Sequence, residues 1–179
     1  DSIKDQSSVD SDKFQSLRDA ALLKITERQA RILDGGGLLR VKPKNRAEEV
    51  YREAADLANE AAKRKDDREA QRVWEGLVAS LQPLGDEFRG WELLAQARAD
   101  ELRATLDRRA AELKSRLLRI QDEIAQGRVP AAIDLFKVTR KEFSAYSDTR
   151  GLLELEEKQL RANLNPEHLK LLEPASDSP

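Results

Sequence analysis

Apolar residues recur every three or four positions along most of the chain, with charged and polar residues between them. This is the spacing of amphipathic α-helices, in which residues three and four apart share a face. Residues 11–34, for example, carry one such stripe: Phe14, Leu17, Ala21, Ile25 and Ile32. No stretch of useful length alternates apolar and polar residues as a β-strand does. We therefore predict an all-α protein.

Turn-forming and capping residues divide this pattern into seven helices. The run of glycines at 35–37 ends the first, because glycine loses more backbone entropy in a helix than any other residue. Asn45 caps the second helix, and Asn165 caps the last, where Pro166 suits the first helical turn. The predicted helices span residues 11–34, 46–64, 67–82, 87–126, 130–145, 149–163 and 166–172.

Short connections between consecutive helices indicate antiparallel helical hairpins, arranged as a repeat array or as an elongated bundle. We expect hairpins at about 46–82 and 87–145, within a helical domain of residues 11–172. The polar stretches before and after it, 1–10 and 173–179, are expected to be tails.

The fourth helix is predicted to be unusually long, because residues 87–126 contain no proline and their only glycine, Gly90, lies in the first turn. It carries six apolar residues separated alternately by four and three positions: Leu106, Ala110, Leu113, Leu117, Ile120 and Ile124. This is the spacing of a coiled-coil seam, which we call the α4 seam. It packs either on the chain's own neighbouring helices or, over residues 102–124, on a second copy in a dimer or larger assembly.

Two segments, 65–77 and 127–139, resemble each other. Each has a turn residue, a small residue five positions later and an aromatic residue four positions beyond that: Lys65, Ala70 and Trp74 in one, Gly127, Ala132 and Phe136 in the other. Alanine lets two helices approach closely, and an aromatic side chain one turn later fills the space between successive hairpins. The alternative interpretation is that any antiparallel helical hairpin requires such packing.

A turn residue, a small residue and an aromatic residue at these offsets resemble the second helix of tetratricopeptide repeats. The second segment matches through Gly127, Ala132 and Phe136, whereas Lys65 departs from the pattern at the turn position. The resemblance covers about 47–82 and 113–145, and the two segments lie 62 residues apart rather than the roughly 34 of adjacent repeats. It implies a scaffold that binds proteins or peptides through a concave helical surface, without naming a partner.

The distribution of charge along the chain limits the classes of molecule that it could bind. The chain has 32 basic and 34 acidic residues, a net charge of -2, and both signs are interleaved along the helices. No segment concentrates positive charge as binding to a phosphate backbone requires, so we expect no nucleic-acid partner. No run approaches the roughly 20 apolar residues of a membrane-spanning helix, so we expect no membrane insertion.

Few residues of the chain are of the types that catalyse reactions or bind metal ions. The chain has no Cys and one His, His168, so it lacks the partners for a zinc site or a thiol nucleophile. Its paired carboxylates are adjacent in sequence, and adjacent side chains on a helix point about 100° apart. We predict no catalytic residues, no cofactor, no metal and no enzymatic activity.

The sequence therefore favours a non-catalytic helical scaffold or protein-interaction domain. Its candidate surface consists of large amphipathic residues of the kind that interfaces favour: Tyr51, Trp91, Arg98 and Tyr146. Two alternatives remain, a self-assembling structural subunit that uses the α4 seam and a regulatory or sensory domain of a larger membrane-anchored protein. Because the chain begins at Asp1 and contains no Met, we expect it to be part of a longer product, cytoplasmic or extracytoplasmic.

Overall fold

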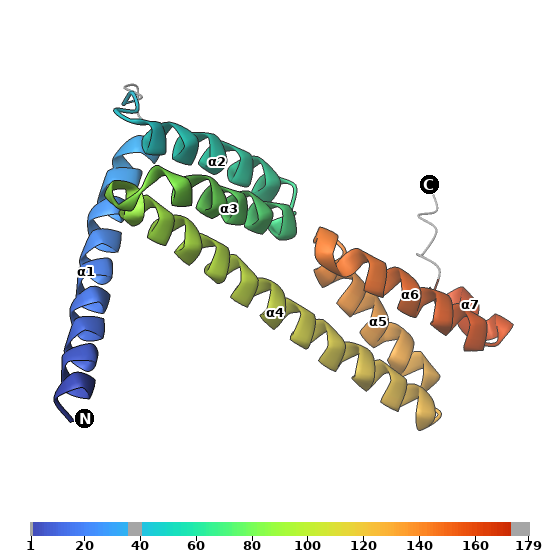
Figure 1. The fold of residues 1–179 in the computed structure, drawn as a ribbon. Helices are drawn as coiled ribbons and strands as arrows, with labels where there is room; N and C mark the ends of the chain where they lie inside the picture. The colour runs from blue at the N-terminus through green and yellow to red at the C-terminus, as the bar shows by residue number, and fades with distance from the viewer. Residues whose placement is uncertain (1, 36–40, 173–179) are drawn as a thin grey trace. The chain divides into compact units, whose positions relative to one another are not determined.

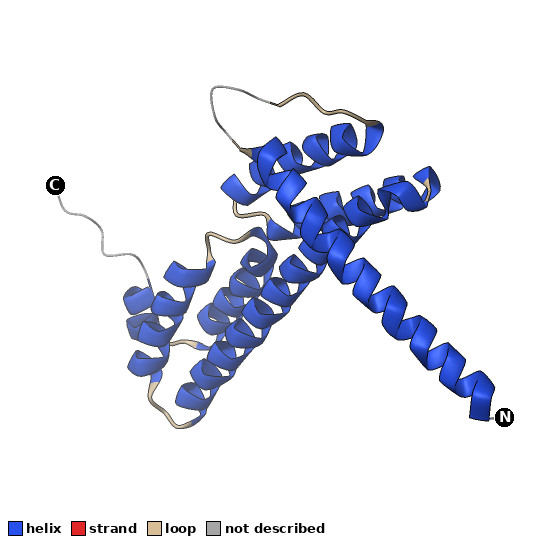
Figure 2. Ribbon diagram, turned by 90° about the vertical axis from the view of Figure 1, so that its left-hand side faces the viewer, coloured by secondary structure: helices blue, strands red, loops and turns tan. Residues whose placement is uncertain are grey.

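The computed structural model of the chain describes residues 2–35 and 41–172, and these are helical almost throughout (Figure 2). The helices are α1 (Ser2–Asp34), α2 (Arg46–Lys63), α3 (Asp67–Leu81), α4 (Arg89–Ala125), α5 (Val129–Phe143), α6 (Ser147–Asn163) and α7 (Pro166–Leu172). Two short 3-10 turns, Gln82–Leu84 and Asp86–Phe88, lie between α3 and α4. The described residues contain no strand, which confirms the all-α prediction, and α4 is a single helix of 37 residues.

The observed helix ends follow the capping residues. Asn45 Oδ1 accepts a hydrogen bond of 2.9 Å from the backbone N–H of Glu48, and Glu48 in turn accepts one of 2.7 Å from the N–H of Lys44. Asn165 Oδ1 accepts one of 2.8 Å from the N–H of His168. Each bond satisfies a backbone donor that has no partner within the helix, so both predicted caps are confirmed.

The predicted N-terminal tail is wrong for residues 2–10, because α1 begins at Ser2. No Pro or Gly interrupts the sequence from there to Asp34, so nothing ends the helix in that direction. The other helix bounds lie within two residues of the predicted ones. The predicted tail at 173–179 lies outside the described residues.

The chain divides into two compact units. Unit 1 comprises Asp1–Lys63 and Glu69–Leu102, and unit 2 comprises Arg64–Arg68 and Arg103–Pro179. In unit 1, α2, α3 and the first part of α4 lie side by side, and the second half of α1 packs at one end of them (Figure 1).

The core of unit 1 is built from three aromatic side chains among many alanines. The Tyr51 ring contacts the Trp74 ring at 5.7 Å and the Trp91 ring at 4.9 Å between centroids, and all three are buried. Buried alanines surround them: Ala47, Ala54, Ala55, Ala58, Ala61, Ala70, Ala95 and Ala99. Small side chains let the helices approach closely, so a few large rings are enough to fill the interior.

Helices α1 and α4 meet at a glycine. A Cβ atom on Gly90 would lie 2.2 Å from the hydroxyl oxygen of Thr26, which is itself buried and donates a hydrogen bond of 2.9 Å to the Leu22 carbonyl. Only a residue without a side chain therefore fits at position 90 without displacing the Thr26 side chain of α1.

In unit 2, α5 supplies more residues of the core than any other helix. The main cluster consists of Ile120 from α4, Ala132, Ile133 and Phe136 from α5, Leu160 from α6 and Leu172 from α7. A smaller cluster joins Leu113, Phe143 and Leu153. Leu117 packs against both clusters, so the second half of α4 is held along its length by the helices that follow it.

The two segments that resemble each other also share a turn conformation. Lys65 has φ +58°, and Gly127, its counterpart, has φ +77°. Helix α3 starts two residues after Lys65 and α5 starts two residues after Gly127, and both are 15 residues long. Lys65 thus holds the left-handed conformation that glycine adopts most easily, so the two turns share this backbone conformation although their residues differ.

We expect Gly90→Ala to destabilise unit 1 by about 1–3 kcal/mol, because the new methyl group must displace Thr26. Gly76→Ala is the matched control: a Cβ there meets nothing within 4 Å, and alanine should stabilise the middle of α3 by about 0.5–1 kcal/mol. Urea unfolding followed by the fluorescence of Trp74 and Trp91 measures both changes. Equal stability of the two variants would contradict the close approach of α1 and α4.

We expect Lys65→Gly to be more stable than Lys65→Ala by about 1 kcal/mol, because both variants lose the lysine side chain but only alanine keeps the cost of the left-handed conformation. Urea unfolding followed by helical circular dichroism compares the two. If the alanine variant were the more stable, the turn at position 65 would not be left-handed.

Candidate interaction surface

Two of the four predicted surface residues lie in the core. Tyr51 is 1% exposed and Trp91 is 5% exposed, and their rings pack against each other inside unit 1. The prediction that they form an interaction surface is therefore wrong. Both lie on the apolar faces of their helices, and burying those faces accounts for their position better than their amphipathic chemistry does.

The Tyr51 hydroxyl satisfies its hydrogen-bonding need inside the unit. It donates a hydrogen bond of 2.9 Å to Asp34 Oδ2, at the end of α1. Burial of the ring, followed by the nearby negative charge of Asp34 and this hydrogen bond, raises the pKa of Tyr51 well above its ordinary value. The hydroxyl is therefore a neutral donor, and its bond ties α2 to the end of α1.

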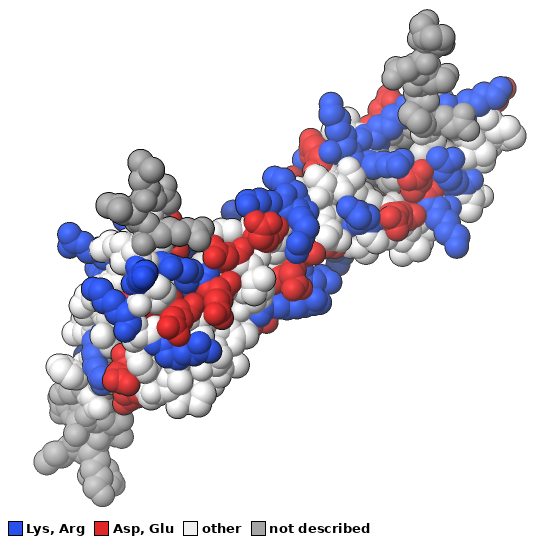
Figure 3. Space-filling view, turned by 90° about the horizontal axis from the view of Figure 1, so that it is seen from above, with Lys and Arg blue, Asp and Glu red and all other residues white. Residues whose placement is uncertain are grey.

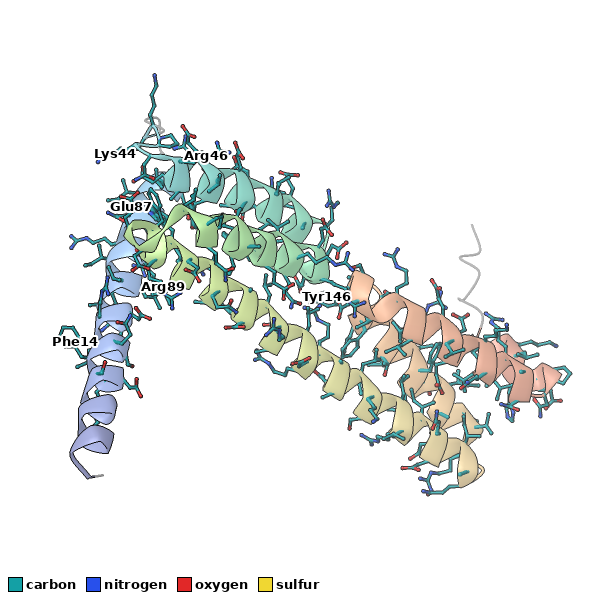
Figure 4. The ribbon with its side chains drawn as sticks, in the orientation of Figure 1. Phe14, Lys44, Arg46, Glu87, Arg89 and Tyr146 are labelled. Atoms are coloured by element: carbon teal, nitrogen blue, oxygen red, sulfur yellow. The ribbon has the colours of Figure 1, made fainter. Side chains whose placement is uncertain are left out.

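Arg98 and Tyr146 keep part of their side chains at the surface, but they belong to different units. Arg98 is about half exposed and forms an ion pair of 3.6 Å with Glu101, one turn later on α4. Tyr146 lies in the turn between α5 and α6 (Figure 4). Of the four predicted residues, Tyr51 and Trp91 are in contact, and that contact lies in the core of unit 1 rather than at its surface.

The α4 seam is occupied by the chain itself. Leu113 and Ile120 are buried, and Leu117 and Ile124 are partly buried against α5, α6 and α7. Of the other seam residues, Leu106 is partly buried and Ala110 is exposed. From Leu113 to Ile124 the seam packs on neighbouring helices of the chain. An interface between copies over residues 102–124 stays a prediction.

A partly buried arginine organises the charged residues of unit 2. Arg109 forms ion pairs with Asp67 and with Asp148, the latter at 2.7 Å, and its guanidinium lies 3.7 Å from the centre of the Tyr146 ring. Partial burial works against its charge, but the hydrogen bonds to the two carboxylates outweigh it and raise the pKa of Arg109. The residue on α4 thus joins the first residue of α3 to the start of α6.

A shallow hollow of about 290 Å³ opens beside Arg109, lined by Thr105, Arg108, Glu112, Glu142, Phe143 and Tyr146. Its carboxylates are engaged: Arg116 pairs with Glu112 at 2.9 Å and with Glu142 at 2.6 Å. Figure 3 shows the same interleaving of opposite charges over the visible surface. Among the described residues, no group of three His, Asp or Glu side chains could hold a metal ion. The hollow therefore resembles a structural network more than a ligand site.

Among the residues whose side chains the structure describes, the two most exposed large apolar side chains, Phe14 and Leu17, lie on α1 together with two further exposed isoleucines. Phe14 is 72% exposed, Leu17 71%, Ile25 57% and Ile32 56%, and Ala21 on the same stripe is also exposed. Figure 4 shows Phe14 pointing away from the other helices. We call these five residues the α1 stripe. Its spacing was visible in the sequence, but the choice of Tyr51 and Trp91 as surface residues overlooked it.

A second apolar set explains why the α1 stripe faces outward. Thr26, Ala30 and Leu33 are buried, and Leu23 packs against the core of unit 1. These residues lie on the other side of the helix from the stripe. The helix carries more apolar surface than the core of unit 1 covers, and this excess was the signal available in the sequence.

Comparison of the chain with known proteins finds no matching family model, no matching curated protein and no matching solved structure. Among the described residues, none of the helices has the length and apolar character needed to cross a membrane.

We expect Arg109→Gln to destabilise unit 2 by about 1–3 kcal/mol, because it leaves the partly buried carboxylates of Asp67 and Asp148 without their cation. Arg108→Gln, on the exposed side of the same turn, is the matched control and should change stability by less than about 0.5 kcal/mol. Urea unfolding followed by helical circular dichroism measures both. Adding Asp67→Asn to Arg109→Gln should recover part of the loss, and an absence of recovery would argue against a paired network.

Proposed function

We propose that this chain is a non-catalytic helical scaffold that binds another protein through the α1 stripe. The observation that carries the proposal is the exposure of four large apolar side chains along one line of a single helix. Exposed apolar side chains scattered singly are ordinary on protein surfaces, whereas a contiguous set marks an interaction site.

Helix α1 presents this stripe from a fixed base. On its other side, Ala30 and Leu33 are buried in the core of unit 1. Asp19 pairs with Arg89 of α4 at 3.3 Å, and Asp34 accepts the hydrogen bond from Tyr51 of α2. A surface held in place before binding loses less conformational entropy when a partner docks, so these contacts favour binding.

The resemblance to tetratricopeptide repeats supports the same class of function. The left-handed turns at Lys65 and Gly127, and the buried pairs Ala70 with Trp74 and Ala132 with Phe136, support a pair of related helical segments. Proteins built from such segments serve as binding scaffolds, although fold analogy names no partner.

A phage-displayed library of helical peptides tests the proposal on the full chain. We expect enriched peptides whose binding falls at least about tenfold in Leu17→Glu, because the substitution places a charge at the centre of an apolar contact. Isothermal titration calorimetry measures the affinities. Leu155→Glu is the matched control, since Leu155 is also an exposed leucine but lies on α6 of unit 2. It should leave binding unchanged.

Light scattering after size-exclusion chromatography completes the test. We expect a mass near 20.2 kDa at all concentrations. A dimer that grows with concentration and disappears in Leu17→Glu would replace the proposal with self-assembly. A library that yields no binder, or binders indifferent to Leu17, would contradict it.

A further inference from the structure

The exposed face of α1 has the spacing of a coiled-coil seam once its charged residues are included. Positions separated alternately by four and three residues run along it: Phe14, Arg18, Ala21, Ile25, Arg28 and Ile32. All six are exposed. We call them the α1 seam. Six residues at this alternating spacing form one line along the helix, and such a line can face a partner helix over its whole length.

The narrowness of this line favours a helix over a lipid surface as the occupant. Helices that lie in a membrane interface bury a broad apolar face, whereas a strict seam is the narrower pattern of helix–helix packing. The α1 seam offers Phe14, Ile25 and Ile32 as its large apolar contacts, with Leu17 beside it. Two arginines take seam positions between them.

The outward side of α1 is basic although the whole chain is nearly neutral. Arg18 and Arg28 lie in the seam, and Lys24 and Arg31 flank it, all four exposed. Among the described residues, no carboxylate forms an ion pair with any of these four. Four cations on one face without a carboxylate partner favour an acidic ligand.

Two acidic residues of α1 have partners inside unit 1. Asp19 pairs with Arg89 at 3.3 Å, and Asp34 accepts the hydrogen bond from Tyr51 at 2.9 Å. Of the other described acids of the helix, Asp12 is exposed and Glu27 is partly buried. The contacts with unit 1 thus engage two carboxylates of α1, while Arg18, Lys24, Arg28 and Arg31 stay exposed.

A second copy of α1 would fit this face poorly. In a parallel pair in register, Arg18 meets Arg18 and Arg28 meets Arg28. In an antiparallel pair centred on the seam, Phe14 meets Ile32 and Arg18 meets Arg28. Both arrangements place like charges opposite each other in a desolvated contact, which is destabilising.

We infer that the α1 seam binds an acidic amphipathic helix of a partner protein, with apolar residues against Phe14, Ile25 and Ile32 and carboxylates against Arg18 and Arg28. The inference rests on the proposed function and names the chemistry of its partner. Arginine suits this role because its planar guanidinium pairs with a carboxylate through two parallel hydrogen bonds.

Three synthetic helical peptides of about four heptads test this on the full chain. They share leucine at the a and d positions and carry glutamate, glutamine or lysine at e and g. We expect the glutamate peptide to bind at least about tenfold more tightly than the glutamine peptide in fluorescence anisotropy, and the lysine peptide to bind most weakly. Added salt should reduce the difference, since it screens exposed charges.

Reversing the charge of the two seam arginines distinguishes a loss of the binding site from a loss of folding. Arg18→Glu/Arg28→Glu should reverse the preference, so that the lysine peptide binds more tightly than the glutamate peptide. A misfolded variant would not gain this binding. Lys114→Glu/Lys137→Glu is the matched control with the same change of net charge, because both lysines are exposed on unit 2. It should keep the preference for glutamate.

The outcomes separate the inference from the proposed function. Equal binding of all three peptides, lost in Leu17→Glu, would overturn the acidic partner and leave the interaction surface in place. Binding of none of them would overturn the acidic helix, and together with an empty peptide library it would overturn the proposed function as well. Binding only to vesicles of phosphatidylserine and phosphatidylcholine, weakened by Arg18→Glu/Arg28→Glu, would replace the helix with an anionic membrane.

Discussion

The contact of Tyr51 with Trp74 and Trp91 is the constraint on which unit 1 depends. Aromatic residues make up only 4% of the chain, so the interior cannot be filled by many large side chains. Alanines bring the helices close, and these three rings fill the space that remains. The hydroxyl of the same tyrosine reaches Asp34 at the end of α1. The interaction that packs the core therefore also sets which side of α1 faces inward, and so which side is left exposed.

Unit 2 also has a thin apolar core, and ion pairs between its charged residues help to hold its helices in place. Its partly buried Arg109 joins Asp67 at the start of α3 to Asp148 at the start of α6, and stacks on Tyr146. An ion pair withdrawn from water is a weak source of net stability because each charge loses part of its hydration, but it is demanding in geometry. We interpret this cluster as the contact that fixes Asp67 and the start of α6 in place. The carboxylates of Asp67 and Asp148 are occupied by this pairing with Arg109. We therefore assign no function to the neighbouring hollow.

The sequence predicted the helices well and their exposed faces poorly, for one physical reason. Helix ends depend on local chemistry, such as the side-chain caps Asn45 and Asn165, and local chemistry is readable from neighbouring residues. Which of two apolar lines on a helix is buried depends on distant residues. Helix α1 carries one line through Ala30 and Leu33 and another through Phe14 and Ile25, and periodicity alone does not rank them. The α4 seam was equally ambiguous, since the same spacing suits a neighbouring helix of the chain or of another copy.

The net charge of -2 conceals what α1 presents to a partner. A basic residue and an acidic residue cancel in a sum wherever they lie, but a partner meets only those that face it. On α1, Asp19 and Asp34 are engaged by Arg89 and Tyr51, whereas Arg18, Lys24, Arg28 and Arg31 remain exposed. The contacts that hold the helix in unit 1 therefore also contribute to its basic face, because they occupy carboxylates and leave these bases open to a partner.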